Sequence, residues 1–165
     1  MLSLTRNQRG MTLAEIIIAV AIIGGGLVAL SAAIPLAGYG IHEGGHLSTA
    51  TFLANERLEQ VRNTRWELGP PAVDNLGVSA SAGAAPVSGG VTTFPDENPI
   101  AAPYSEYSRS VRVTDCGVGA GCSGIVSADM RQVMVTVTYR PMTGVGVSPA
   151  GTTKPAMVSM YIAKR

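Results

Sequence analysis

One acidic side chain at the start of a long apolar run is the residue of this sequence that most needs a chemical explanation. Glu15 is followed by a stretch from Ile16 to Ala37 that has no charged residue and is long enough to cross a bilayer as a helix. A carboxylate at the edge of a bilayer is costly unless it finds a cationic partner. Cleavage after Gly10 would create one, because the new amino group on Met11 would lie within about one helical turn of Glu15. We interpret the site as one kept for pairing with such an amine, in the same chain or in a neighbouring one.

Two basic residues, Arg6 and Arg9, precede the apolar run, and the first ten residues contain no acid. Because positive residues stay on the cytoplasmic side, we expect a cytoplasmic N-terminus, one membrane span and an external C-terminal domain. A secretory signal peptide cut near Ala32 is an alternative, but it leaves the carboxylate unexplained. A single-span anchor that keeps residues 1–10 is another.

A second pattern with chemical potential is the segment His42-Glu43-Gly44-Gly45-His46, which has the form H-E-x-x-H. On a regular helix this spacing presents two histidines to a zinc ion while the glutamate activates water. Each central glycine weakens that helix by about 1 kcal/mol relative to alanine. A third ligand would have to be a carboxylate such as Glu56 or Glu59, which the same helix carries away from the site. We therefore predict no metal and no cofactor, and keep a metallopeptidase as the minor alternative.

Two cysteines, Cys116 and Cys122, lie close together in the part of the chain that the topology places outside the cytoplasm. Disulfides form and persist in such compartments. We predict one disulfide that closes a short loop. Two free thiols are the alternative, because spacing alone does not show that the two Cβ atoms meet. A zinc site is not expected, since no histidine follows His46 to complete a ligand set.

The segment from Arg9 to Glu15, followed by the apolar residues 16–23, resembles the class III signal of type IV pilins and type II secretion pseudopilins. The resemblance implies that a prepilin peptidase cuts between Gly10 and Met11 and methylates the new amine. It also implies that Glu15 pairs with the N-terminus of a neighbouring subunit. Met11 stands where the family more commonly has phenylalanine, and it remains apolar. The assembly positions implied in this way are Thr12, Leu13 and Glu15.

The stretch from Ala54 to Arg62 resembles the continuation found in minor pilins of the V type and in I-type pseudopilins. The resemblance implies an α+β fold of the type IV pilin kind, with a long N-terminal helix packed on a small antiparallel sheet. The partners it implies are other pilin or pseudopilin subunits, the prepilin peptidase and an inner-membrane assembly platform. The precursor would be a single-pass inner-membrane protein, and the assembled subunit would lie in a periplasmic or cell-surface filament.

This layout divides the chain into segments with different expected structures. They are a prepilin leader at 1–10, a transmembrane and assembly half of the stalk helix at 11–37, a soluble half of the stalk helix at 38–68, a loop rich in Gly, Ala, Ser and Pro at 69–106, and an antiparallel sheet at 107–165. In the loop, at most short strands are expected. Its Asp96, Glu97 and Asn98 offer oxygen ligands for calcium, but EF-hand spacing is missing, so we predict a solvated turn.

The stalk helix has weak points where glycine and proline interrupt the apolar run. These residues are Gly24, Gly25, Gly26 and Pro35. Each interior glycine costs about 1 kcal/mol and an interior proline about 3 kcal/mol relative to alanine. We expect interruptions here, and we predict that the stalk bends or melts locally between Gly24 and Gly45 when the subunit leaves the membrane for a filament.

Periodicity predicts the elements that follow. Apolar residues at three- and four-residue steps indicate a helix whose stripe packs on a globular domain; they are Leu47, Ala50, Ala54, Leu58 and Val61. Three strands are predicted at 107–114, 132–140 and 156–163. The middle strand is the clearest, because valines at 133, 135 and 137 alternate with more polar residues, as in a sheet with one buried face.

Composition and motifs favour a structural protein over an enzyme. Removing residues 1–10 leaves ten basic against eleven acidic residues, so no basic patch suggests nucleic-acid binding. We predict a minor pilin of a type IV pilus-like filament. The alternatives are a pseudopilin of a type II secretion or DNA-uptake machine, and a single-span envelope protein that never polymerises.

Overall fold

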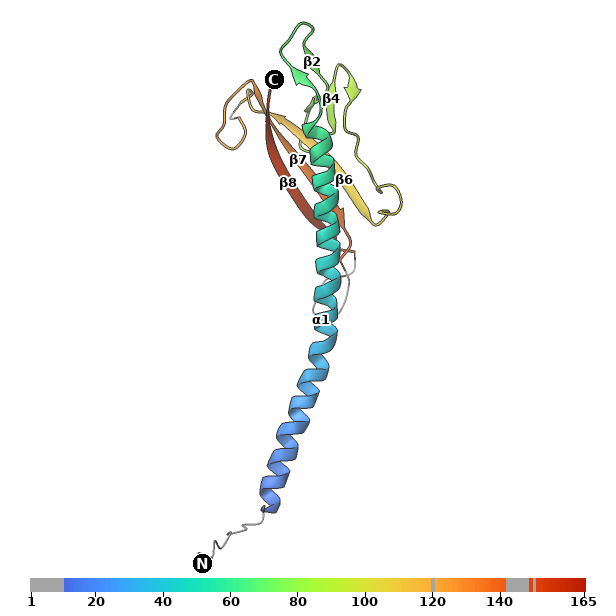
Figure 1. Ribbon diagram of the computed structural model, residues 1–165, viewed down its shortest axis with the longest axis vertical. Helices are drawn as coiled ribbons and strands as arrows, with labels where there is room; N and C mark the ends of the chain where they lie inside the picture. Colours follow the sequence, from blue (N-terminus) through green and yellow to red (C-terminus); the bar gives the residue numbers. More distant parts are fainter. Residues whose placement is uncertain (1–10, 120, 142–148, 150) are drawn as a thin grey trace, which may run out of the picture. The chain divides into compact units, whose positions relative to one another are not determined.

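The computed structural model describes residues 11–119, 121–141, 149 and 151–165. In these residues one long helix, α1 (Leu13–Arg62), precedes eight strands (Figure 1). The strands form antiparallel sheets with the orders β1-β2, β3-β4-β5 and β6-β7-β8. This layout confirms the predicted α+β class, with a long N-terminal helix and an antiparallel sheet packed on it. The chain divides into two compact units between Ile41 and His42, inside α1.

The strands differ greatly in length. The short ones are β1 (Trp66–Glu67), β2 (Val73–Asp74), β3 (Val78–Ser79), β4 (Pro86–Ser88) and β5 (Val91–Thr92). The long ones are β6 (Tyr107–Asp115), β7 (Met130–Tyr139) and β8 (Lys154–Ala163). The long strands confirm the three predicted ones to within two residues at each end. Only short strands, β2 to β5, lie in the predicted loop.

The first unit consists of the N-terminal part of α1. Its helix runs without a break through the glycine triplet at 24–26 and through Pro35, so the expected interruptions are absent from the single chain. A proline removes one helical hydrogen bond, and a glycine adds no steric conflict, so a long cooperative helix can continue past both. Melting of this region in a filament stays a prediction.

In the second unit, the rest of α1 lies along one face of the β6-β7-β8 sheet (Figure 1). Burial alternates along β7, where Val133, Val135 and Val137 are fully buried and face the helix. The helix buries mostly small residues against them, namely Ala50, Leu53, Ala54 and Val61. Leu58 is partly buried as predicted, but Leu47 is 47% exposed. The buried stripe of α1 therefore consists of residues 50, 53, 54 and 61, and Leu47 lies at its edge.

The end of α1 differs from the sequence-based boundary. The helix stops at Arg62, and Trp66–Glu67 form β1, so the last residues of the segment predicted as helical are extended. Thr64 N–H donates to the carbonyl of Val61, which tightens the chain after the last turn. The extended backbone lets Trp66, which is 4% exposed, enter the core. Burial of this large aromatic ring outweighs the local helix preference.

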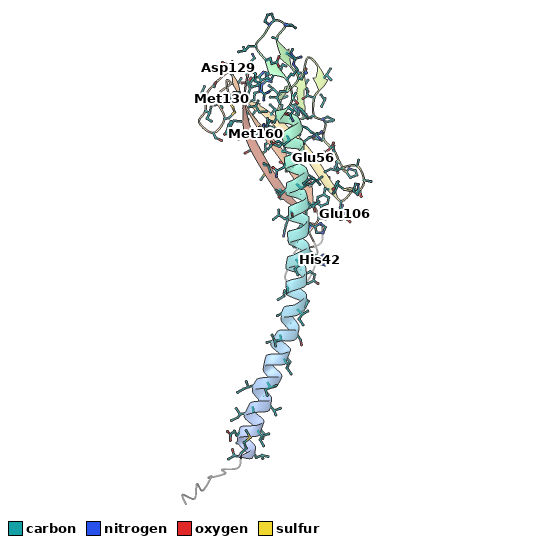
Figure 2. The ribbon with its side chains drawn as sticks, in the orientation of Figure 1. His42, Glu56, Glu106, Asp129, Met130 and Met160 are labelled. Carbon is teal, nitrogen blue, oxygen red and sulfur yellow. A yellow bond between two sulfur atoms is a disulfide. The ribbon has the colours of Figure 1, made fainter. Side chains whose placement is uncertain are left out.

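A buried arginine on β6 joins α1 to the sheet. Arg109 is 7% exposed and lies on the same face of β6 as Val111 and Val113. Its Nε donates to Glu97 Oε2 at 2.6 Å, and its Nη1 donates to the carbonyl of Leu53 at 3.0 Å and to Glu56 Oε2 at 3.2 Å (Figure 2 labels Glu56). One guanidinium thus satisfies acceptors from the helix and from the 96–98 segment at once.

A second buried arginine holds the short strands. Arg131 on β7 makes a bidentate pair with Asp74 on β2, at 2.7 and 2.8 Å. Its guanidinium lies 4.3 Å from the ring centroid of Trp66, which is a cation–π distance. Asp74 also accepts the backbone N–H groups of Leu76 and Gly77. The pKa of Asp74 is lowered by the Arg131 hydrogen bonds, against the effect of burial.

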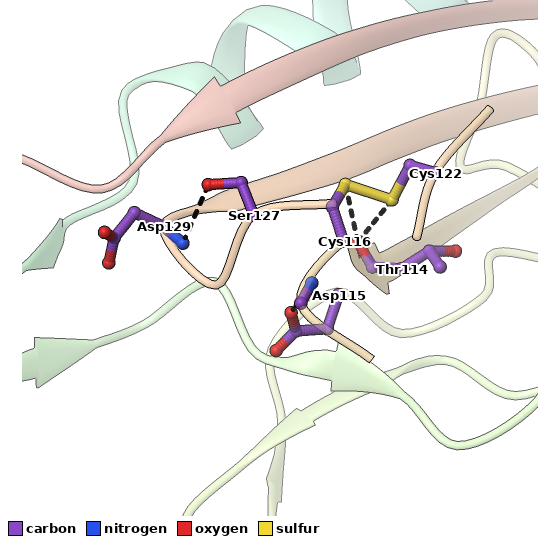
Figure 3. The surroundings of a disulfide bond; sticks show 7 residues. Thr114, Asp115, Cys116, Cys122, Ser127 and Asp129 are labelled. Atoms are coloured by element: carbon purple, nitrogen blue, oxygen red, sulfur yellow. Dashed lines mark hydrogen bonds between the residues drawn. A yellow bond between two sulfur atoms is a disulfide. The ribbon is translucent and has the colours of Figure 1, made fainter. Parts of the chain in front are cut away.

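A disulfide closes the connection between β6 and β7. Cys116 and Cys122 are bonded, with their Cα atoms 4.8 Å apart, as predicted (Figure 3). Gly121 has φ +73° and directly precedes Cys122; a Cβ there would lie 2.1 Å from the carbonyl oxygen of Ile125. Only glycine fits this backbone conformation and this close approach.

We expect Arg109→Met to lower the free energy of unfolding of the second unit by about 3 kcal/mol, because it leaves Glu97 and Glu56 without their buried cation. Urea unfolding of the full chain in detergent measures the change. Arg65→Met is the matched control, since Arg65 makes only an exposed pair with Glu67. Equal stability of the two variants would contradict a central role for Arg109.

Candidate functional site

The predicted assembly segment begins with a helix cap. Thr12 Oγ1 accepts the backbone N–H of Glu15 at 3.3 Å, and the Thr12 carbonyl accepts the N–H groups of Glu15 and Ile16. Thr12 is therefore the N-cap and Glu15 the third helical residue, the spacing of a capping box. The Thr-x-x-Glu pattern was visible in the sequence, but its capping role was not recognised there.

This cap places the Glu15 carboxylate in the first helical turn, where the helix dipole favours negative charge. Residues 11–41 contain no lysine or arginine. No lysine or arginine side chain of this part of the helix can therefore neutralise Glu15. Gly10, on the other side of the predicted cleavage point, lies outside the described residues, and Met11 and Leu13 are exposed beside the cap.

The helix that follows is apolar on all sides and uncovered. Every large apolar side chain from Ile16 to Leu36 is at least 47% exposed. By length and composition α1 can cross a membrane, and its most apolar stretch buries nothing within the described residues. Such a helix is typical of a segment that lies in lipid or among other helices.

The His42-Glu43-Gly44-Gly45-His46 segment lies on α1 at the start of the second unit. Glu43 Oε1 accepts hydrogen bonds from the Tyr139 hydroxyl at 2.9 Å and from Lys154 Nζ at 2.8 Å. His46 Nδ1 is hydrogen-bonded to the Tyr107 hydroxyl at 2.9 Å. We call these five residues, Glu43, His46, Tyr107, Tyr139 and Lys154, the tyrosine clamp.

The tyrosine clamp engages two of the three side chains that a zinc peptidase would use, Glu43 and His46. The imidazole of His46 stacks on Tyr139, with 5.9 Å between ring centroids and 12° between ring planes. His42 is exposed on α1 (Figure 2). No group of three or more His, Cys, Asp or Glu side chains suited to a metal ion occurs among the described residues. In this structure the glutamate of the motif ties α1 to β7 and β8.

Charge and burial act in opposite directions within the tyrosine clamp. The hydrogen bond from Lys154 is the main cause that lowers the pKa of Glu43, and the Tyr139 hydroxyl lowers it further, whereas burial opposes both. Burial and the neighbouring Glu43 carboxylate raise the pKa of Tyr139 to about 12. The ionised glutamate and the neutral tyrosine therefore persist together at neutral pH.

The acidic segment that offered calcium ligands is instead bound to arginines. Asp96 makes a bidentate pair with Arg112 at 2.6 and 2.8 Å, and Glu97 pairs with Arg109 and Arg57. Burial would raise the pKa of Glu97, but the hydrogen bond and charge of Arg109, with the charge of Arg57, lower it overall. The predicted solvated turn is wrong for Glu97, which also forms a backbone bridge to β6.

Comparison with known families identifies the N-terminal segment. Residues 5–32 match the family model described as a prokaryotic N-terminal methylation motif. The match supports a type IV pilin-like family and a precursor that prepilin peptidase processes, and it points to structural proteins rather than enzymes. The comparisons with curated proteins and with solved structures gave no match.

The tyrosine clamp predicts a pH-dependent stability. The pKa of Glu43 is lowered on folding, so its contribution is complete above its ordinary pKa of about 4.5 and is lost as the pH falls through the folded value. Glu43→Gln should destabilise the second unit by about 1 kcal/mol at pH 7, and the difference from the parent should shrink below pH 4.5. Thermal unfolding at several pH values measures it.

The exposed Glu106 supplies the control for this experiment. Glu106→Gln makes the same change of charge outside the tyrosine clamp and should leave the pH profile of the parent unchanged. A Glu43→Gln deficit that stays constant down to the lowest pH would contradict the assignment.

Proposed function

We propose that this chain is a minor pilin, a structural subunit that prepilin peptidase releases from its leader and that joins a type IV pilus-like filament through the N-terminal half of α1. The observation that carries the proposal is the capped Thr12 to Glu15 turn at the head of an uncovered apolar helix, within the methylation motif. A pseudopilin of a secretion or DNA-uptake machine would share this chemistry and differ in the assembly platform with which it copurifies.

The charge of the N-terminal half supports pairing of Glu15 with a processed amine. Residues 11–41 contain Glu15 as their one charged side chain. Cleavage before Met11 removes Arg6 and Arg9 and creates an amine one residue before the N-cap Thr12. A carboxylate in a low-dielectric setting is strongly stabilised by a nearby cation. The processed amine of a neighbouring subunit would satisfy Glu15 and set the axial register between two stalks.

The exposed side chains from Ile16 to Leu36 supply the remaining surface of assembly. Lipid tails are as apolar as these side chains, so moving the helix from lipid to a site among other helices gives little hydrophobic free energy. The stabilisation comes mainly from close packing between the helices. Small residues assist this by allowing close approach of backbones. At Gly24, Gly25 and Gly26, an added Cβ would meet nothing within 4 Å apart from the adjoining helix backbone. The apolar helix would provide affinity, and Glu15 the register.

In the second unit, polar bonds hold the sheet to α1 at two levels. The tyrosine clamp acts at Glu43 and His46, and Arg109 acts at Leu53 and Glu56. A subunit placed in a filament by its helix would therefore carry residues 42–62 and the sheet as one body. This rigidity suits a structural subunit whose outer surface must be presented at a defined position.

The processing step is tested by the mass of the N-terminal peptide. We expect protein from the membrane fraction of a host that carries a prepilin peptidase to begin at methylated Met11. An intact Met1 would indicate an uncleaved anchor, and a start beyond Ala32 would indicate a secreted protein; either result would overturn the proposal. The same host without the peptidase is the control, and it should yield the unprocessed N-terminus.

The pairing step is tested by Glu15→Ala. We expect recovery in filaments to fall about tenfold or more, since a lost charge pair in a low-dielectric contact exceeds about 1.4 kcal/mol. The amount of membrane-inserted precursor and the folding of the second unit should be unchanged. Ser31→Ala is the matched control, because it removes a side-chain oxygen from an exposed position further along the same helix and keeps the carboxylate and its cap. Equal filament recovery for Glu15→Ala and the parent would contradict the proposed pairing.

A further inference from the structure

The outer edge of β8 carries backbone groups that no described strand pairs. β8 pairs with β7 along its whole length, and it is the last strand in its sheet. Lys164 N–H donates to the carbonyl of Asp129 at 2.8 Å, which extends the β7 to β8 register by one pair. Hydrogen-bonded pairs alternate along an antiparallel ladder. The backbone groups of residues 156, 158, 160 and 162 therefore point to β7, and those of 155, 157, 159, 161 and 163 point to the open edge.

Apart from Pro155 at one end, the residue types along this edge lack the usual protection against strand pairing. Natural edges carry charged side chains, proline, bulges or a covering element. Residues 155–163 contain no charged side chain. Pro155 lies at an outward position, where its missing N–H costs no bond to β7, as expected for an edge strand. The rest of the edge, from Ala156 to Ala163, can accept another strand.

One end of the edge already binds extended backbone. Arg165 N–H donates to the Trp66 carbonyl at 3.0 Å, and Leu68 N–H donates to the Arg165 carbonyl at 2.8 Å. These two bonds are those of a parallel β-bridge between Arg165 and the 66–68 segment. They show that the backbone groups of Arg165 point to the open edge, as do those of the other odd-numbered residues of β8. The edge geometry is therefore competent for strand addition, and residues 66–68 mark where an added strand must end.

Beside the edge lies a groove with an apolar floor and a basic rim. The groove has a volume of about 480 Å³ and is lined by Glu59, Arg62 and residues 160–165. Met160 and Ile162 are only partly buried there and pack against the core (Figure 2 labels Met160). The groove is lined by three basic residues, Arg62, Lys164 and Arg165, and by one acidic residue, Glu59. Glu59 is already paired with Arg62. On the outer face, Met157 and Tyr161 are 63% and 39% exposed.

We propose that the open edge of β8 binds an extended segment of another protein by strand addition. An extended backbone is the ligand that supplies donors and acceptors at the spacing of residues 157 to 163. Alternate apolar side chains of the segment cover Met160 and Ile162. An acidic side chain at its N-terminal end, in the antiparallel orientation, lies beside Lys164 and Arg165.

Charge argues against a second copy of this chain at the same edge. Antiparallel pairing of two β8 strands centred on Ser159 sets Lys154 of one copy opposite Lys164 of the other at both ends. Like charges directly opposite destabilise a sheet. β8 also offers no acidic residue to the basic rim. The complementary segment therefore comes from a different sequence, and this inference does not depend on the filament proposed above.

Residue-resolved hydrogen exchange of the full chain in lipid nanodiscs tests the proposal. The probe is a short synthetic peptide in which Val alternates with Thr and the N-terminal residue is Asp. We expect exchange about tenfold slower at the amides of 157, 159, 161 and 163 when the peptide is bound. The amides of 156, 158, 160 and 162 should not change, because β7 already binds them. Absence of this alternation at saturating peptide would overturn the proposal.

Variants separate strand addition from other occupants of the groove. Ser159→Pro removes one N–H that points to the open edge and keeps the hydrogen bonds between β8 and β7, so it should weaken peptide binding about tenfold. Ser159→Ala, its control, should bind the peptide as the parent does. Lys164→Glu should reverse the preference for a peptide with Asp over one with Lys. Slow exchange at 156 and 158 verifies that each variant is folded. Protection that grows with protein concentration without peptide would show a second copy at the edge and overturn the assigned partner.

Discussion

The structure of the second unit depends on one buried guanidinium. Arg109 lies on β6, and its side chain donates to Leu53 and Glu56 on α1 and to Glu97. Its charge is tolerated in the core because two carboxylates and a helix carbonyl surround it, whereas loss of one partner would leave an uncompensated buried charge. The contact fixes the rotation of the helix about its axis, since only one face presents Leu53 O and Glu56 together. The 96–98 segment is fixed to the same point.

Polar ties of this kind matter because the apolar contact of α1 is small. Two of its four fully buried residues are alanines, which contribute little area. The tyrosine clamp acts near one end of the contact and Arg109 further along the helix, while Arg131 holds the short strands through Asp74 and Trp66. A domain of this size gains specificity from such bonds, because each fits only one relative position of the elements. Within the described residues, the same rigidity leaves β8 with an ordered edge that no strand pairs.

Local patterns predicted those elements whose cause is local. Alternation along 132–139 located β7, and the apolar run located α1. Two nearby cysteines in a segment expected outside the cytoplasm indicated the disulfide. Errors arose where distant residues decide. Leu47 fits the helical period but is exposed, because Glu43 and His46 face the sheet at that level. For the H-E-x-x-H segment, where no metal was predicted, the spacing did not indicate the observed role: its glutamate binds Tyr139 and Lys154, which are remote in the chain.

The sequence by itself determined the chemistry of the N-terminal half. An uncharged apolar run begins directly after one carboxylate, so their spacing along a helix is known without a fold. The N-cap role of Thr12 became evident only from its bond to the backbone of Glu15. Only the tertiary structure decided the use of the charged residues in the second unit. No local pattern shows the partners of Arg109, Arg131 and Glu43, because most of these partners lie 40 or more residues away in the chain and meet them only after the sheet forms. The open edge of β8 is likewise a property of strand order, which no local pattern records.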